Sequence, residues 1–197
     1  MNTARWVLAL LCVVMVPPAI VHWLVVHPFA RFWRRVGPPR SYVLLVAIYA
    51  TVAAVMVALS GPILAVEYGT NWLLIGLAAV IYVVSATIEV RCRRLLSARM
   101  LLGGPELDPA AGRDRLLTEG IYGRMRHPRY VAALLGLVAV ALFCNYLGLY
   151  VLVALTVPAL YAVALLEERE LLDRFGDEYR EYLERVPRFI PKKPQAA

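Results

Sequence analysis

The segment from Tyr130 to Leu166 contains no charged side chain, and this apolar run constrains the fold more than any other feature of the sequence. A helix needs about 20 apolar residues to cross a bilayer, because all its backbone N–H and C=O groups must be paired within the helix. The run is too long for one crossing, and Cys144, Asn145 and Tyr146 interrupt it near its middle. We therefore predict two antiparallel membrane helices joined by a tight turn.

Three more apolar runs precede this hairpin, and each is long enough for a membrane helix. They are Trp6–Val26, Tyr42–Val66 and Trp72–Val90. The first contains Pro17 and Pro18, which predict a kink. We interpret it as a retained span rather than a signal peptide, because no small-residue cleavage site follows it. Since 61% of the 197 residues are hydrophobic, we predict an all-α, polytopic membrane protein with about five transmembrane helices.

The distribution of positive charge predicts the orientation in the membrane. Of the 21 lysine and arginine residues, all but Arg5 lie in the segments 28–40 and 91–129 or after Leu166. Because cytoplasmic segments carry the excess of basic residues, we expect the N-terminus outside and the C-terminus in the cytoplasm. The net charge of +7 is then a matter of topology, and no cluster of basic and aromatic residues suggests a nucleic-acid partner.

These features divide one membrane domain, residues 1–197, into four parts. They are the first three helices (1–96), a cytoplasmic segment (97–129), the hairpin (130–166) and a cytoplasmic tail (167–197). In the tail, Glu167–Glu184 has apolar residues at helical spacing, which predicts one amphipathic helix lying on the membrane or over the hairpin. Its apolar face consists of Leu171, Leu172, Phe175, Tyr179, Tyr182 and Leu183.

Charged residues stand at the beginning and at the end of the predicted hairpin. Arg126 and His127 precede Pro128, which suits the first turn of a helix, so they lie at the positive end of the helix dipole, where a carboxylate can bind. Glu167 and Glu168 directly follow the apolar run. The antiparallel fold therefore predicts that this Glu pair and the Arg126–His127 pair share the cytoplasmic surface. Taken singly, each residue is better explained as a boundary anchor or ion pair.

The joint pattern is more informative than its members. In order, the chain has T-x-G-x-Y, R-H-P-x-Y, the apolar hairpin, the Glu pair, F-G-x-E-Y-x-x-Y and V-P-x-x-x-P. The residues are Thr118, Gly120 and Tyr122; Arg126, His127, Pro128 and Tyr130; Glu167 and Glu168; Phe175, Gly176, Glu178, Tyr179 and Tyr182; Val186, Pro187 and Pro191. From about Leu116 to Pro191, the chain thus resembles the isoprenylcysteine carboxyl methyltransferase and phospholipid methyltransferase group of membrane enzymes.

The resemblance implies an enzyme that binds S-adenosyl-L-methionine between the hairpin and the cytoplasmic segments. It implies catalytic roles for Arg126 and Glu167, no metal, and a hydrophobic or lipid-like methyl acceptor, with no obligate protein partner. A carboxylate can grip the ammonium and hydroxyls of this cofactor, and methyl transfer mainly requires alignment of the reacting atoms. The implied cofactor-binding residues are Leu116, Leu117, Gly120, Tyr122, His127, Pro128, Tyr130, Glu167 and Glu168.

One departure from the family pattern bears on the acceptor. The eukaryotic prenylcysteine enzymes carry a basic residue about one turn before the glutamates, whereas Ala162–Leu165 are all apolar here. A substrate carboxylate would lack its partner unless Arg126 or Arg188 substitutes. Because an unpaired carboxylate near the membrane is costly, we expect a neutral acceptor or one that reacts through a thiol, amine or hydroxyl.

Two alternatives stay open at the level of the sequence. Membrane sterol reductases, which use NADPH, are similar around the R-H-P-x-Y element but tend to have an Asp pair and a downstream Cys. A non-enzymatic scaffold or transporter subunit would bind no cofactor. Elsewhere, Glu89 lies four residues before Arg93 and is either an intramembrane functional acid or half of a boundary ion pair.

Overall fold

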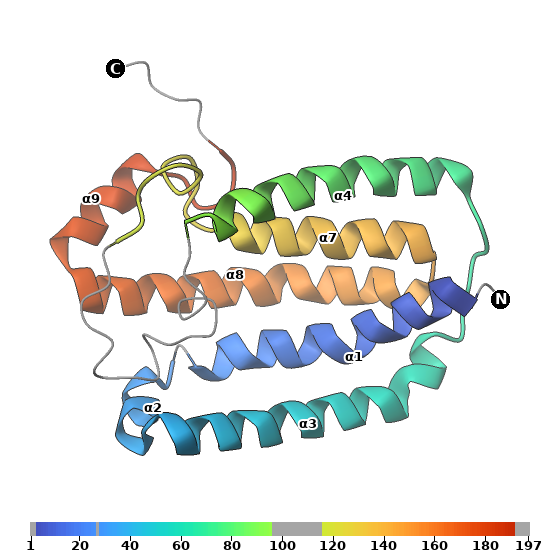
Figure 1. Ribbon diagram of the computed structural model, residues 1–197, viewed down its shortest axis with the longest axis horizontal. Coiled ribbons are helices and arrows are strands. Elements are labelled where there is room, and N and C mark those ends of the chain that lie inside the picture. Colours follow the sequence, from blue (N-terminus) through green and yellow to red (C-terminus); the bar gives the residue numbers. More distant parts are fainter. Residues whose placement is uncertain (1–2, 27, 96–115, 192–197) are drawn as a thin grey trace.

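The structure is a computed structural model that describes residues 3–26, 28–95 and 116–191. Its elements in these ranges are the helices α1 (Thr3–Val26), α2 (Ala30–Val36), α3 (Pro38–Ile63), α4 (Trp72–Arg93), α7 (Pro128–Cys144), α8 (Leu147–Phe175) and α9 (Asp177–Arg185). The long helices lie side by side in the order α4, α7, α8, α1 and α3 (Figure 1). Most of the predicted cytoplasmic segment, residues 97–115, lies outside the described residues.

Four of these helices, α1, α3, α4 and α8, are long and apolar enough to cross a membrane, with hydropathy values of 2.2 to 2.5. In the 18-residue apolar stretch of each helix, at most 28% of the residues are buried within the protein. Side chains of this kind are stable on an outer surface only when lipid covers them. The prediction of an all-α, polytopic membrane protein is confirmed. The helix α7 is a shorter apolar helix of 17 residues, or about 26 Å in length.

The predicted hairpin is also confirmed, and its second helix is longer than expected. α7 ends at Cys144, and Asn145 has a left-handed backbone with φ of 59°, a conformation that asparagine tolerates better than most residues. α8 then begins at Leu147 and continues past Leu166 to Phe175. The Glu pair therefore belongs to α8 itself.

The prediction of one continuous amphipathic helix over Glu167–Glu184 is wrong. Gly176 has φ of 58°, which ends α8, and α9 begins at the next residue. Glycine permits this turn because it has no Cβ. The predicted apolar face nevertheless stays together, because α9 folds back so that its tyrosines join the end of α8. The resulting cluster contains Leu116, Leu171, Leu172, Phe175, Tyr179, Tyr182, Leu183 and Val186.

Helix α2, which lies within the basic segment 28–40, is not predicted from the sequence. Trp33 of α2 is buried and packs against Val26 and Leu45. Its indole Nε1 donates a hydrogen bond to the Val25 carbonyl at 3.0 Å. An interior tryptophan thus joins the end of α1 to α3.

Small side chains allow α4 and α7 to pack closely. Ser85 of α4 donates from Oγ to the Ala132 carbonyl of α7 at 2.8 Å. A Cβ atom at Gly136 would lie only 3.2 Å from Ser85 Oγ. Ala78 and Cys92 extend the buried face of α4 in both directions. Small residues are typical of membrane helix interfaces, where close backbone approach replaces the hydrophobic effect.

Arg5 is buried at the end of the hairpin that lies farthest from the Glu pair, and it is only 3% exposed. Its guanidinium donates to Thr70 Oγ1 and the Gly69 carbonyl at 2.8 Å each, and also to the Cys144 carbonyl. Glu67 Oε1 lies 3.9 Å from Arg5 Nη1. The sequence analysis assigns Arg5 no such partners. These contacts fasten α1 to the turn before α4 and to the tip of the hairpin.

We expect Arg5→Ala to destabilise the fold far more than Arg40→Ala, which removes an exposed arginine. Breaking a buried charge network costs on the order of 3 kcal/mol, whereas an exposed arginine contributes little. Unfolding followed by tryptophan fluorescence in detergent would measure both changes. Equal losses in the two variants would show that the Arg5 contacts add no stability.

Candidate functional site

The site is built where α7 begins and α8 nears its end. His127 caps α7 and Pro128 occupies the first turn, as predicted. The C-terminal segment crosses this helix start, because the N–H of Arg126 donates to the Pro187 carbonyl at 2.9 Å and that of His127 to the Arg188 carbonyl at 3.1 Å. These two N–H groups just before the helix are thus engaged by the protein itself.

His127 lies between the two carboxylates of the Glu pair. Its Nε2 is 3.0 Å from Glu168 Oε1 and its Nδ1 is 3.2 Å from Glu167 Oε2. Carboxylates only accept hydrogen bonds, so both ring nitrogens must carry a proton. Burial by itself lowers the pKa of His127, but the hydrogen bonds and negative charges of Glu167 and Glu168 outweigh it and raise the pKa above 6.5. His127 is therefore an imidazolium that joins α7 to α8.

Glu168 is the more enclosed member of the pair, with a side chain 7% exposed. Arg188 grips it with both ends of its guanidinium, from Nε to Oε1 at 2.9 Å and from Nη2 to Oε2 at 2.7 Å. Such a two-pronged pair is among the strongest charge-assisted contacts in proteins. With His127 on Oε1 as well, Glu168 holds the C-terminal segment against α7 and α8.

Glu167 is more open, with a side chain 29% exposed. Its Oε2 accepts a hydrogen bond from the Tyr130 hydroxyl at 2.7 Å. The ring of Tyr130 stacks on that of His127 at 5.3 Å between centroids, with the planes within 8°. Neighbouring carboxylates on one helix thus have different environments, one enclosed by cations and one partly accessible.

Arg126 is the cation of the cluster whose charge is least compensated. Its side chain is 10% exposed, and its Nε lies 3.5 Å from Glu168 Oε1. That Nε is buried and has no hydrogen-bond partner in the described structure. Arg126, His127 and Arg188 together exceed the two carboxylates by one positive charge. The cluster can therefore accept one further negative group.

Tyrosines form the wall beside these charges. The Tyr182 hydroxyl donates to the Tyr122 carbonyl at 2.6 Å, and Tyr122 shares a side-chain hydrogen bond with Cys92. Burial raises the pKa of Tyr122, Tyr179 and Tyr182 above the usual value near 10. These phenols consequently stay neutral, and Tyr182 acts as a hydrogen-bond donor. Leu116 packs against Tyr179 and Tyr182.

The structure brings together most of the residues that the sequence singled out. Arg126, His127, Tyr130, Glu167 and Glu168 form one cluster, so the predicted meeting of the hairpin's two ends is confirmed. Pro128 is buried beside them, and Leu116 and Tyr122 reach the adjoining tyrosine wall. The two remaining predicted positions are not among the contacts of this cluster. Gly120 is exposed, with φ of 60°, and faces Leu95, whereas Leu117 is half-buried.

Sequence reasoning missed the role of Arg188, which it considered only as a possible partner for a substrate. The V-P-x-x-x-P motif contains this residue, but a motif does not reveal that the segment returns to α8. Phe189 and Tyr161 were also missed. Phe189 lies 5.8 Å from the ring of His127, and Arg188 lies over Tyr161 at 5.4 Å. Glu89 pairs with Arg93 at 2.7 Å, as the ion-pair interpretation predicts.

Comparison with known proteins identifies the family to which the chain belongs. The profile of the phospholipid methyltransferase family matches residues 76–178, just over half of the chain. The protein belongs to the phospholipid methyltransferase family. The matched region runs from α4 into α9 and includes His127 and both glutamates, whereas Arg188 lies beyond it.

Curated relatives share part of the same region. Methanethiol S-methyltransferase 1 of Bradyrhizobium diazoefficiens is 36% identical over 46% of this chain and 30% of its own length. The cobalt-zinc-cadmium resistance protein CzcN of Cupriavidus metallidurans is 37% identical over 40% of this chain and 37% of its own. The nickel-cobalt-cadmium resistance protein NccN of Alcaligenes xylosoxydans xylosoxydans is 32% identical over 39% and 36%. The chain thus spans about a third of the length of these relatives. No solved structure matches it.

The charge on His127 makes the stability of the protein depend on pH. Because its pKa is raised in the folded protein, its contribution is complete below about pH 6.5 and is lost as the pH rises through the folded pKa. We expect the unfolding free energy to fall as the pH rises above about 6.5, and to fall less in His127→Gln. Denaturant unfolding in detergent at several pH values would test this. Parallel pH profiles for the two proteins would contradict it.

Proposed function

We propose that this protein is an S-adenosyl-L-methionine-dependent methyltransferase that methylates a hydrophobic thiol at the membrane boundary. One observation carries the proposal: the Glu167–His127–Glu168 cluster lies inside the region that matches a methyltransferase family. The family implies a methyl donor. A relative named for S-methylation of methanethiol supports sulfur as the acceptor atom.

The donor set of the cluster fits the polar groups of this cofactor. Its carboxylate suits Arg126, whose buried Nε has no hydrogen-bond partner in the described structure and whose charge is the surplus of the cluster. Its ammonium or ribose hydroxyls suit Glu167, the more accessible carboxylate. The neutral tyrosines and Leu116 offer an apolar wall for an aromatic ring. Glu168, held by Arg188, supports His127 from behind.

When bound, S-adenosyl-L-methionine supplies an electrophilic methyl group on a sulfonium. The task of the protein is then to align an acceptor sulfur with that methyl and to favour its ionised form. His127 carries protons on both nitrogens and is therefore unsuited to act as a general base. Nearby cations lower the pKa of a thiol, and the sulfonium of the bound cofactor would supply such a charge, because the positive surplus at Arg126 is taken by the cofactor carboxylate. The thiol proton would pass to water, and the sulfur electrons would form the new S–C bond while the bond between the methyl group and the cofactor sulfur breaks, so that S-adenosylhomocysteine leaves.

The surroundings of the Glu pair favour a neutral, hydrophobic acceptor over an anionic one. Val163 and Ala164, one turn before the pair, are fully buried. Arg188, the remaining cation that could meet a substrate carboxylate, already grips Glu168 with both prongs. An anionic prenylcysteine would have to compete with the cofactor for Arg126.

Cofactor binding is expected to depend on Glu167 and His127. In calorimetry with S-adenosylhomocysteine in detergent, Glu167→Gln and His127→Ala should each weaken binding by about 1.5–3 kcal/mol, or roughly ten- to a hundredfold. Arg40→Gln is the control, because it removes an exposed arginine at the start of α3 that has no part in the charge cluster.

Two results of the calorimetry would contradict the proposed function. One is unchanged affinity in both Glu167→Gln and His127→Ala when the variants unfold like the wild type. The other is tight binding of NADPH with no binding of S-adenosylhomocysteine, which would favour a reductase.

The acceptor can be identified by competition. Membranes containing the protein would receive labelled S-adenosyl-L-methionine together with a hydrophobic thiol, a lipid amine and a prenylcysteine analogue. We expect label in the thioether product and none in a Glu167→Gln control. Efficient methyl-ester formation on the prenylcysteine, with little transfer to the thiol, would show that the cluster accommodates an acceptor carboxylate after all.

A further inference from the structure

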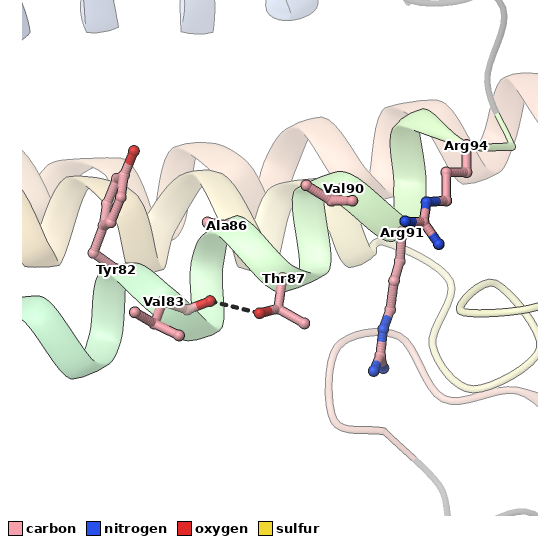
Figure 2. Close-up of a pocket in the computed structure, with 7 residues that line it drawn as sticks. All are labelled: Tyr82, Val83, Ala86, Thr87, Val90, Arg91 and Arg94. Atoms are coloured by element: carbon pink, nitrogen blue, oxygen red, sulfur yellow. Dashed lines mark hydrogen bonds between the residues drawn. The ribbon is translucent and has the colours of Figure 1, made fainter.

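One face of α4 contributes nothing to the site and little to the helix packing. Ala78, Ser85 and Cys92 form the buried side of α4. On the outward surface, Tyr82 and Val83 are 60% and 62% exposed, and they line a shallow groove together with Ala86, Val90, Arg91 and Arg94 (Figure 2). Two hydroxyls line the groove, those of Tyr82 and Thr87, and that of Thr87 is already bonded to the Val83 carbonyl at 2.7 Å. The greater part of the groove is therefore apolar.

Two positive charges close the end of this groove. Arg91 and Arg94 are both exposed, and neither has an ion-pair partner within the described part of the chain. The nearby acid, Glu89, is taken by Arg93 at 2.7 Å. The carbonyl end of α4 offers only about half a negative charge. An anion can therefore bind to Arg91 and Arg94 without displacing an ion pair among the described residues.

The geometry points to an anionic phospholipid on this face of α4. We propose that one acyl chain lies along Tyr82, Ala86 and Val90 and that the phosphate binds between Arg91 and Arg94. The distance along the helix from Tyr82 to Arg91 is about 14 Å, which matches the apolar depth of one leaflet, about 15 Å. The arginines therefore reach the level of the phosphates, and the planar guanidinium favours paired hydrogen bonds to phosphate oxygens.

The bound lipid should be anionic, because a zwitterionic headgroup would place its own cation beside Arg91 and Arg94. The choline or ethanolamine of such a lipid would meet Arg91 and Arg94 and cancel much of the attraction. A phosphatidylglycerol headgroup has a net negative charge and adds hydroxyls. The proposal is independent of the methyl-transfer chemistry, because the groove contains none of the residues of the charge cluster.

The test compares phosphatidylglycerol with phosphatidylcholine of the same acyl chains by native mass spectrometry of the full chain in detergent. The wild type should bind phosphatidylglycerol more tightly. Arg91→Gln/Arg94→Gln should weaken that binding roughly thirtyfold, because each arginine near an anionic lipid contributes about 1 kcal/mol to binding. The binding of phosphatidylcholine should stay unaffected. Glycerol phosphate, which lacks acyl chains, should bind poorly to every variant.

The matched control is Arg35→Gln/Arg40→Gln, which removes the same charge from exposed arginines at the α2–α3 end of the bundle. Equal binding of both lipids to the wild type would overturn the proposal. Equal weakening by the two double variants would also overturn it, because net charge rather than the groove would then be responsible. A concentration-dependent dimer that excludes lipid from α4 would likewise overturn the proposal. Unchanged S-adenosylhomocysteine affinity in Arg91→Gln/Arg94→Gln would establish that the fold is intact.

Discussion

The ion cluster around Glu168 is the interaction on which the remainder of the site depends. A carboxylate this enclosed at a membrane boundary is tolerated only when cations and hydrogen bonds replace the water that it loses. Arg188 supplies two hydrogen bonds, His127 a third, and Arg126 a nearby positive charge. These partners come from the C-terminal segment and from the start of α7. The contacts that neutralise Glu168 therefore also hold both segments against α8.

This arrangement separates two functions between neighbouring glutamates. Consecutive residues on a helix point about 100° apart, so Glu167 and Glu168 cannot have the same surroundings. Glu168 points into the cations and positions His127, whereas Glu167 stays accessible beside Tyr130. His127 couples the two, since each of its protons faces one carboxylate. A ligand that binds Glu167 would consequently be held by a group whose orientation the buried ion cluster already sets.

The sequence predicts features that follow from length and periodicity, and it fails where distant segments meet. The apolar run from Tyr130 requires a hairpin, and a hairpin necessarily returns Glu167 to Arg126. By contrast, the grip of Arg188 on Glu168 depends on a C-terminal segment whose path no local pattern specifies. Arg5 was unpredictable for the same reason, because its partners lie more than 60 residues away. At Gly176, one backbone angle divides a helix that periodicity alone would continue.

Charged side chains hold both ends of α7 in place, and the length of this helix determines how deep the site lies in the membrane. Arg5 binds the Cys144 carbonyl at one end of α7, and the Glu pair holds His127 at the other. At 17 residues, α7 measures about 26 Å, a few ångströms less than the ~30 Å hydrocarbon core. If its tip lies at one surface, His127 and the Glu pair lie slightly below the other. A cluster at that depth must pair most of its charges within the protein, and the proposed hydrophobic acceptor would reach it directly from the bilayer.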